Sequence, residues 1–443
     1  MCKKARGAQL RAWHRSRFGT IRGMRGIFDQ YEQPENRLTH ALVSCLAEDK
    51  RLLRHFVRWL LKGGPPPRAR LNLLEQQLPG ESPVSEEEAE ARGLPDAWIH
   101  DGRSWALIIE SKVAARARGG QLRKYLETAH RRGFEDARLV VLAVRAPAEL
   151  PPKSHFVPWS DVYSWCRREA GRSDWAGRMA DYMEVLEAKM VADGYLKEGK
   201  LTVFSGVPFG RDHPYNYREA KRILRLAMGE LRTREKLAKE LGVDLEAPGR
   251  PAITGEESSL VWDFLRFRGE AAKDPFTKHP HLALSIRSED VFAFLTLPNG
   301  MKTSYRRSLI RLGPGGFRSL IGEVASRLTD ALKEARGACP WMEVLQRRYL
   351  RHRSIPTVDA GLRFDLRTAT QCEYPERGEW PKHQPEWLDA AFSAFQNKES
   401  NLQVALGAVF PYDSCSAVHS KRAIALFAAT WIACKPLIQV LVA

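Results

Sequence analysis

The stretch LPDAWIHDGRSWALIIESKV, residues 94–113, decides the fold predicted for the N-terminal part of the chain. Asp101-Gly102 lies between two apolar runs, and both residues tolerate the positive φ that tight hairpins require. The two runs are therefore predicted to be strands that pair across this turn. The open end of the hairpin, where the first strand begins and the second finishes, carries two acidic residues and one lysine.

Asp96, Glu110 and Lys112 are predicted to converge at that open end. Pairing across the turn brings Asp96 opposite residues 107–109, and hence close to Glu110. Because residues two apart in a strand share a face, Glu110 and Lys112 point the same way, about 7 Å apart. Charges that directly follow the apolar run 106–109 are costly to place there unless they serve a site. The pattern therefore favours a functional site over an ion pair at the exposed end of a strand.

The segments around the hairpin predict a small α/β sheet with helices packed on it. A leucine-rich apolar stripe, interrupted near residues 47–50, indicates helix before the hairpin, and residues 70–78 can form a first strand. Gly119-Gly120 leads into a helix after the hairpin. The nearly continuous apolar run 137–144 indicates a strand buried on both faces, and one more strand and helix follow it.

Three motifs of the chain resemble those of the PD-(D/E)XK nuclease superfamily: Pro95-Asp96, Glu110-Ser111-Lys112 and Gln121. This superfamily includes many restriction endonucleases and repair or defence nucleases. The resemblance covers residues 31–165 and includes the hairpin, the helix that follows it and the buried strand. It implies a restriction-endonuclease-like α/β domain over residues 24–193, with a central mixed sheet flanked by helices.

The resemblance implies hydrolysis of phosphodiester bonds that depends on Mg²⁺, with Mn²⁺ as an alternative cation. This reaction needs an activated water and a counter-charge for the transition state, and a divalent cation supplies both. Mg²⁺ prefers oxygen ligands and usually takes one or two carboxylates, so Asp96 and Glu110 are the expected ligands. Lys112 is expected to orient the attacking water or to stabilise the charge of the transition state.

Two more residues join the site through the resemblance. Family members often have a glutamate on the helix before the sheet, which matches Glu35; it would bind a metal-coordinated water or a second metal. Gln121 would help to position the water or a phosphate. Each residue also has a plainer interpretation, because Glu35 suits the start of any helix and Gln121 can be an ordinary first-turn residue. Asp96 can likewise be a turn residue.

The chain is strongly basic, with 70 Lys and Arg against 53 Asp and Glu, a formal net charge of +17 and a pI of about 9.7. A field of this sign attracts polyanions such as nucleic acid. Four basic residues after the hairpin are the candidate phosphate contacts: Arg116, Arg118, Arg123 and Lys124. We expect nucleic acid, in particular DNA, as the partner. The competing hypothesis is a non-catalytic protein that binds nucleic acid or another partner on a nuclease scaffold.

The two ends of the chain carry no sign of secretion or membrane insertion. Residues 1–23 hold seven basic residues and no acid, so they are expected to form a disordered basic arm or an extension that precedes a start at Met24. Seven scattered cysteines form no CxxC, which indicates reduced thiols in a cytoplasmic protein. The apolar segment 423–443 is interrupted by Lys435 and Pro436, so we expect a buried terminal helix and no membrane span.

Residues 194–443 are expected to form an α+β region of unknown role, either one domain or two subdomains divided near residue 340. The predicted elements are a strand at 201–207, a basic helix at 217–241 ended by Gly242, a hairpin of 291–297 with 301–305, strands at 342–350 and 361–366, and a helical C-terminus from about 386. His279 and His281 have no cysteine or carboxylate beside them, and they are expected to be a polar surface pair.

The biological setting follows from analogy of fold alone. A free-standing nuclease of this design fits bacterial defence or restriction, with the C-terminal region recognising the substrate or sensing a trigger. Nucleases of this kind also make a homodimer one of the expected states.

Overall fold

The computed structural model describes residues 34–61, 70–81, 88–89, 92–197, 199–250, 259–269, 275–348, 357–370, 382–397 and 401–442. The expected basic arm at 1–23 lies outside these residues. The chain divides into two compact units, Met1–Val203 and Phe204–Ala443, which we call the N-terminal and C-terminal units. Each is described by itself. We expected the boundary after residue 193, whereas the N-terminal unit continues to Val203.

A mixed five-stranded sheet forms the centre of the N-terminal unit, as the sequence predicts. Its strands, in spatial order, are β1 (Asn72–Glu75), β2 (Ala97–His100), β3 (Trp105–Lys112), β4 (Asp136–Ala143) and β5 (Ser154–Pro158). β1, β2 and β3 pair antiparallel, whereas β3, β4 and β5 run parallel. β3 and β4 are buried on both faces over most of their length, which explains their nearly continuous apolar sequences.

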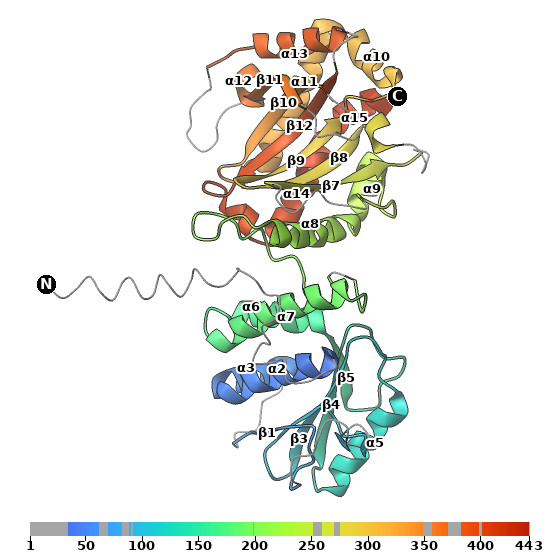
Figure 1. Cartoon of the computed structure of the whole chain (residues 1–443), viewed down its shortest axis with the longest axis vertical. Coiled ribbons are helices and arrows are strands. Elements are labelled where there is room, and N and C mark those ends of the chain that lie inside the picture. The colour runs from blue at the N-terminus through green and yellow to red at the C-terminus, as the bar shows by residue number, and fades with distance from the viewer. Residues whose placement is uncertain are drawn as a thin grey trace, which may run out of the picture. The chain divides into compact units, whose positions relative to one another are not determined.

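Helices cover both faces of this sheet (Figure 1). One face packs against α2 (Pro34–Glu48), α3 (Lys50–Leu60), α6 (Trp159–Glu169) and α7 (Asp174–Ala192). The other face packs against α5 (Gly119–Arg131). Successive residues of β3 alternate between them, so that Leu107 and Ile109 lie in the first core and Ala106 and Ile108 in the second.

The interruption predicted near residues 47–50 separates α2 from α3. Asp49 takes an extended conformation there and caps α3, because its Oδ1 accepts hydrogen bonds of 3.0 Å from the N–H groups of Arg51 and Leu52. The predicted Asp101-Gly102 turn is present within a loop of several residues. Gly102 has φ +75°, and Asp101 Oδ1 accepts bonds from the N–H groups of Arg103 and Trp105.

The C-terminal unit contains a seven-stranded sheet in which all neighbours pair antiparallel. In spatial order the strands are β11 (Thr357–Asp365), β10 (Cys339–Arg348), β12 (Leu402–Pro411), β9 (Asp290–Leu297), β8 (His281–Arg287), β7 (Leu260–Phe267) and β6 (Val243–Asp244). Strands from both sides of residue 340 therefore lie in one sheet. The alternative of two subdomains divided near residue 340 is not what the structure shows.

The helices of the C-terminal unit and one face of its sheet form a single large core. The helices of this unit are α8 (Tyr217–Arg232), α9 (Glu235–Leu241), α10 (Thr303–Arg311), α11 (Gly313–Leu332), α12 (Leu366–Thr370), α13 (Glu386–Gln396), α14 (Arg422–Ala433) and α15 (Lys435–Val442). Two short 3₁₀ helices are η1 (Phe276–Lys278) and η2 (Ser416–His419). Figure 1 shows the long strands of the sheet together with these helices.

Several predictions for the C-terminal unit were wrong in detail. Residues 201–207 form no strand, and the long helix is broken into α8 and α9 at Thr233, whose Oγ1 donates to Glu230 O over 2.8 Å. Gly242 does end α9 with φ +69°. Residues 301–305 are not the second strand of a hairpin, because α10 begins there and β9 pairs with β8 and β12.

Two further observations concern side-chain environment and membrane insertion. His279 and His281 are buried, so the expectation of a polar surface pair was wrong. Five cysteines among the described residues are free thiols: Cys45, Cys166, Cys339, Cys415 and Cys434. Over the described ranges no single helix has the length and apolar character to cross a membrane, and α14 with α15 reaches that length only as a pair bent by 47°.

Candidate active site at the open end of the β2–β3 hairpin

Asp96 is held at the open end of the hairpin by a backbone hydrogen bond from the neighbouring strand. Ala97, the first residue of β2, pairs with Ile109, so Asp96 lies one step further along, at the level of Glu110. The N–H of Ser111 donates to Asp96 Oδ2 over 2.6 Å. Only 9% of Asp96 is exposed. This geometry agrees with the register that the sequence predicts, and the Asp96 carboxylate is fixed by the strand that carries Glu110.

Glu110 and Lys112 lie on the same face of β3 and contact each other. Lys112 Nζ is 3.0 Å from Glu110 Oε1. Glu110 is 1% exposed, whereas the Lys112 side chain is 17% exposed and so reaches the edge of the site. Alternation along β3 places both residues on the face covered by α5, the face that also holds Ile108. Asp96 is two residues before Trp98 along the same strand direction, so its side chain lies on this face too.

Helix α5 adds Gln121 and Tyr125 to the site. Gln121 Nε2 donates to the Tyr125 hydroxyl over 2.5 Å, and the hydroxyl lies 3.4 Å from Leu94 O. Burial raises the pKa of the Tyr125 phenol well above its usual range, and the negative charges of Glu110 and Asp96 raise it further. The phenol therefore lies near both carboxylates and stays protonated. Gln121 reaches the acidic pair through Tyr125.

Sequence reasoning did not assign Tyr125 to the site. The available signal was its spacing, because Gln121 and Tyr125 are four residues apart and therefore stack on one face of a helix. That spacing alone does not distinguish a site residue from an apolar contact of the helix with the sheet. In the structure Tyr125 is 3% exposed and belongs to the core beneath α5, and its hydroxyl is influenced by Glu110 and Asp96.

Glu35 stays a prediction. It lies in the first turn of α2, but its side chain is outside the described residues. Leu38 and Leu42 of α2 pack with the sheet face that holds Leu107, which is opposite to the face of Glu110. The body of α2 is therefore on the other side of the sheet from the acidic pair.

The four predicted phosphate contacts lie between β3 and the first turns of α5, and all four are exposed. Arg123 forms an ion pair of 2.5 Å with Glu149, and both side chains are at least half exposed. Such an exposed pair contributes little to stability and can be broken by a competing phosphate. Arg118 precedes α5 as its N-terminal flanking residue. Four exposed basic side chains thus follow Lys112 within residues 116–124.

The residues at the hairpin end fit a divalent cation by their chemistry. Asp96 and Glu110 supply two carboxylates, and Mg²⁺ commonly uses one or two together with waters. Two carboxylates beside a single lysine leave one excess negative charge in a nearly buried place, which a cation offsets. Within the described ranges, no group of three or more His, Cys, Asp or Glu is arranged to hold a metal ion. The proposed third ligand, Glu35, has no described side chain.

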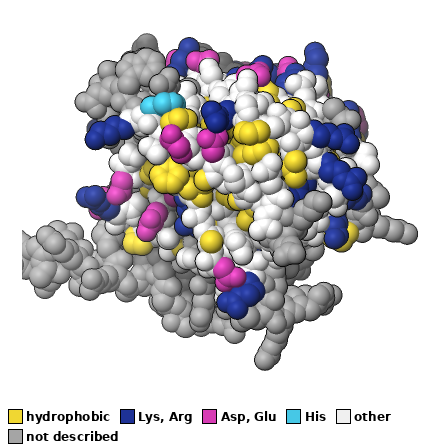
Figure 2. Space-filling view, turned by 90° about the horizontal axis from the view of Figure 1, so that it is seen from above, with side chains coloured by type: hydrophobic (Ala, Val, Ile, Leu, Met, Phe, Trp, Pro, Cys, Tyr) yellow, Lys and Arg dark blue, Asp and Glu magenta, His cyan; other side chains and the backbone are white. Residues whose placement is uncertain are grey.

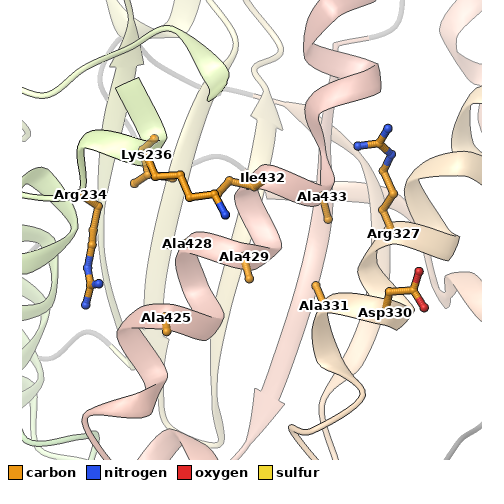
Figure 3. A pocket seen from close by; sticks show the side chains of 11 residues that line it. Arg234, Lys236, Arg327, Asp330, Ala331, Ala425, Ala428, Ala429, Ile432 and Ala433 are labelled. Carbon is orange, nitrogen blue, oxygen red and sulfur yellow. The ribbon is translucent and has the colours of Figure 1, made fainter. Parts of the chain in front are cut away.

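A pocket of about 450 Å³ lies elsewhere, between α9, α11 and α14 (Figure 3). Its floor consists of small residues of α14: Ala425, Ala428, Ala429 and Ala433. Arg234 and Lys236 line one side, and Arg327 and Asp330 line the other. Because its lining has a single carboxylate, this pocket does not offer the paired acids that the chemistry above requires.

Positive charge is spread over the surface rather than gathered in one place on the face shown in Figure 2. Lys and Arg side chains stand around this face, with acidic and hydrophobic side chains between them. The net charge of +17 is therefore not explained by one continuous basic patch on that face.

Comparisons of the chain with models of protein families, with curated proteins and with solved structures found no match.

Proposed function

We propose that the N-terminal unit is a metal-dependent nuclease that hydrolyses phosphodiester bonds, with DNA as its expected substrate. The observation that carries the proposal is the convergence of Asp96, Glu110 and Lys112 on one sheet face beside α5. The order of helices and strands around the mixed sheet supports the restriction-endonuclease-like assignment, because it is the order that the resemblance implies. Fold alone would not indicate a reaction, so the argument rests on the side chains.

In this proposal Asp96 and Glu110 would hold Mg²⁺ or Mn²⁺, which would activate a water and offset charge in the transition state. The Ser111 amide keeps the Asp96 carboxylate oriented. Lys112 places an ammonium 3.0 Å from Glu110, where it can hold the attacking water or stabilise charge on the phosphate oxygens. Lys112 is more exposed than Glu110, so in this proposal it would meet the substrate first.

Gln121 and Tyr125 would act as positioning residues. Tyr125 is a neutral hydroxyl beside two carboxylates, so it can donate a hydrogen bond to one of them without adding charge. Gln121 fixes the orientation of that hydroxyl. Arg116, Arg118 and Lys124 would contact the phosphate backbone of the substrate next to the site, without reading its sequence.

The experiment is incubation of purified protein with supercoiled plasmid, linear DNA and RNA, each with Mg²⁺, with Mn²⁺ and with EDTA. Cleavage that requires the cation and disappears in Asp96→Asn supports the proposal. Asp136→Asn is the matched control, because this carboxylate lies on the neighbouring strand β4 at the level of Trp105. It is five residues, or about 17 Å, from the level of Glu110.

The second candidate is a non-catalytic protein that binds nucleic acid or another partner on the same scaffold. Calorimetric titration with Mg²⁺ separates the two. A nuclease should show binding that is lost in Glu110→Gln, whereas a scaffold without a site should show no heat that depends on these carboxylates. A role in bacterial defence or restriction, and a homodimer, remain expectations from the resemblance to nucleases.

A further inference from the structure

The seven-stranded sheet of the C-terminal unit has two unlike faces. One face joins the helices in a single large core. On the other face a separate cluster is made of strand residues alone: Phe292, Ala405 and Val409, with Phe294 and Trp341 partly buried against them. Among the described residues this face has no layer of long helices, and η1 packs on it through Phe276 beside Trp262 and Phe264. An open face of an antiparallel sheet is normally polar. Aromatic side chains on such a face indicate that it binds something.

Strand register places three aromatic residues in one row across this second face. Phe264 pairs with Ala283, Ala283 with Phe294, Phe294 with Gly407, and Gly407 with Trp341. Aromatic and small residues thus alternate over five strands. Since neighbouring strands are about 4.8 Å apart, successive aromatic residues are about 10 Å apart, with a residue that has little or no side chain between them.

Replacing Gly407 with any larger residue would cause a steric clash. A Cβ added there would lie 2.1 Å from the backbone oxygen of Ala293 and 2.6 Å from the Cα of Phe294. Close packing of the two backbones therefore requires glycine at this point. As a result, β12 contributes no side chain between Phe294 and Trp341 in this row.

Arginine side chains lie over the aromatic rings of the same face. The guanidinium of Arg250 is 4.1 Å from the centre of the Trp262 ring. That of Arg287 is 5.0 Å from the centre of the Phe292 ring and also forms an ion pair with Asp290, which a phosphate would compete with. Phe292 in turn stacks on Phe294, with ring centres 4.3 Å apart. Arginine and aromatic residues interleaved on one surface are the combination that binds single-stranded nucleic acid, because rings stack on bases and cations attract phosphates.

A buried polar group also lies on this face. Thr296 is 4% exposed, and its Oγ1 has no hydrogen-bond partner within the described part of the chain. Thr296 pairs with His281 on one side and Ala405 on the other, two positions from Phe294. A buried hydroxyl without a partner is costly.

We propose that this face binds a single-stranded stretch of nucleic acid, with bases stacked on Phe294 and Trp341 and the backbone near Arg287 and Arg250. The inference rests on the proposed function and refines it by naming the form of nucleic acid that the C-terminal unit selects. A duplex fits this face poorly, because its base edges are read by an element that enters a groove, whereas this face is the surface of a pleated sheet. A second copy of the chain is the competing occupant.

The test is binding of a fluorescein-labelled 20-nucleotide oligo(dT) to the full chain in EDTA, measured by fluorescence anisotropy. The Asp96→Asn variant is used as the parent so that cleavage does not interfere. We expect tighter binding to oligo(dT) than to a duplex of equal length. Phe294→Leu and Trp341→Ala should each weaken oligo(dT) binding by about tenfold, since each removes one stacking ring.

Phe294→Leu keeps an apolar side chain of similar reach, so the sheet should still fold, and the midpoint of urea unfolding checks this. Trp387→Ala is the matched control, because Trp387 is an exposed tryptophan on helix α13 of the same unit. It should leave oligo(dT) affinity unchanged.

Unchanged affinity in both Phe294→Leu and Trp341→Ala would overturn the inference. If instead these variants convert a dimer to a monomer in sedimentation experiments at unchanged oligo(dT) affinity, the face is an interface between copies of the chain. Neither result bears on the nuclease proposal, whose failure would appear as absence of cation-dependent cleavage in the wild-type protein while oligo(dT) binding in EDTA persists.

Discussion

The backbone N–H of Ser111 donates a 2.6 Å hydrogen bond to Asp96 Oδ2, and this bond joins the two strands that carry the acidic pair. Ser111 is the residue between Glu110 and Lys112, so its amide belongs to the same short segment as both. Orientation of Asp96 is therefore set by the segment whose side chains it faces. The three charged groups are positioned by a single pairing of β2 with β3.

Removing the charge of either carboxylate should abolish cleavage and leave the fold intact. Asp96→Asn keeps an oxygen that can accept the Ser111 N–H, and Glu110→Gln keeps the volume of a side chain that is 1% exposed. Because each change would remove a proposed cation ligand, we expect a loss of at least about a hundredfold in cleavage rate. Gel assays at saturating Mg²⁺, with circular dichroism as the check of folding, measure both effects.

The Asp136→Asn control should cleave at the wild-type rate, since Asp136 is a half-exposed partner of Arg138 away from the site. Near-normal, metal-dependent cleavage by Asp96→Asn or Glu110→Gln would show that these carboxylates are not the ligands.

Replacing Lys112 with alanine should lower the rate of the chemical step far more than it lowers metal affinity. An ammonium that acts chiefly in the transition state contributes to the rate and little to the binding of Mg²⁺ or substrate. We expect a fall of about two to four orders of magnitude in single-turnover cleavage. Lys112→Arg should restore little, because the broader guanidinium is not a compact proton-sharing group.

Lys124→Ala is the control for Lys112, because Lys124 is an exposed lysine of α5 nearby. It should weaken substrate binding without slowing the chemical step. Loss of metal binding in Lys112→Ala with normal cleavage at saturating Mg²⁺ would instead make Lys112 a structural counter-ion of the acidic pair.

Gln121 and Tyr125 should behave as one unit in a double-mutant cycle. Gln121 contacts the site through the Tyr125 hydroxyl, so Tyr125→Phe should already remove most of what Gln121→Ala removes. We expect each single variant to slow single-turnover cleavage by about tenfold and the double variant to be little slower. Additive effects would show that Gln121 acts by itself, for example on a phosphate.

The raised pKa of Tyr125 gives a prediction for alkaline pH. The unfolded phenol ionises near pH 10, whereas the folded phenol resists ionisation because of its burial and the nearby carboxylates. Its contribution to stability is therefore fully present below pH 10 and is lost as the pH rises further. Urea unfolding between pH 9 and pH 11 should show a smaller alkaline loss of stability in Tyr125→Phe than in the wild type.

His281 predicts the opposite dependence for the C-terminal unit. It is 2% exposed and lies among Trp262 and Phe264, and burial, assisted by the charge of Arg266, lowers its pKa from 6.5 to about 4. The His281 imidazole is therefore protonated near pH 6.5 in the unfolded chain, but only near pH 4 in the folded chain. The contribution of His281 to the free energy of unfolding should be fully present above pH 6.5 and should fall by roughly 3 kcal/mol as the pH drops to 4.

Urea unfolding at pH 7 and pH 4.5 measures this loss. His281→Leu should show a smaller difference between the two pH values, whereas His383→Gln, which changes an exposed histidine, should show the wild-type difference. If His281→Leu and the wild type lose the same stability between pH 7 and pH 4.5, the loss is caused by other titrating groups.

The site hairpin could be predicted because its signals are local. Alternation along residues 105–112 and the Asp101-Gly102 turn determine which side chains share a face, and no distant contact is needed to place them. Tyr125 could not be assigned in the same way, because its role depends on how α5 packs on the sheet. The side chain of Glu35 depends likewise on the orientation of a helix, and it stays a prediction.

The C-terminal sheet was harder to predict because its pairs are distant in sequence. β12 is a continuous apolar run that we expected to be helical, and such a run gives no periodicity that separates a buried strand from a buried helix. It pairs with β9, more than 100 residues earlier. The turn after β9 is real, since Met301 N donates to Pro298 O over 3.0 Å, but it leads into α10.

The alternation of β3 between two cores makes the site sensitive to insertions and deletions. One residue added between Trp105 and Glu110 would exchange the faces of every residue after it, so Glu110 and Lys112 would point toward α2 and Ser111 toward α5. Two added residues would restore the face and move the pair about 7 Å along the strand, away from Asp96. Length of this strand, counted from its hairpin loop, is therefore under a constraint as strict as the identity of its charged residues.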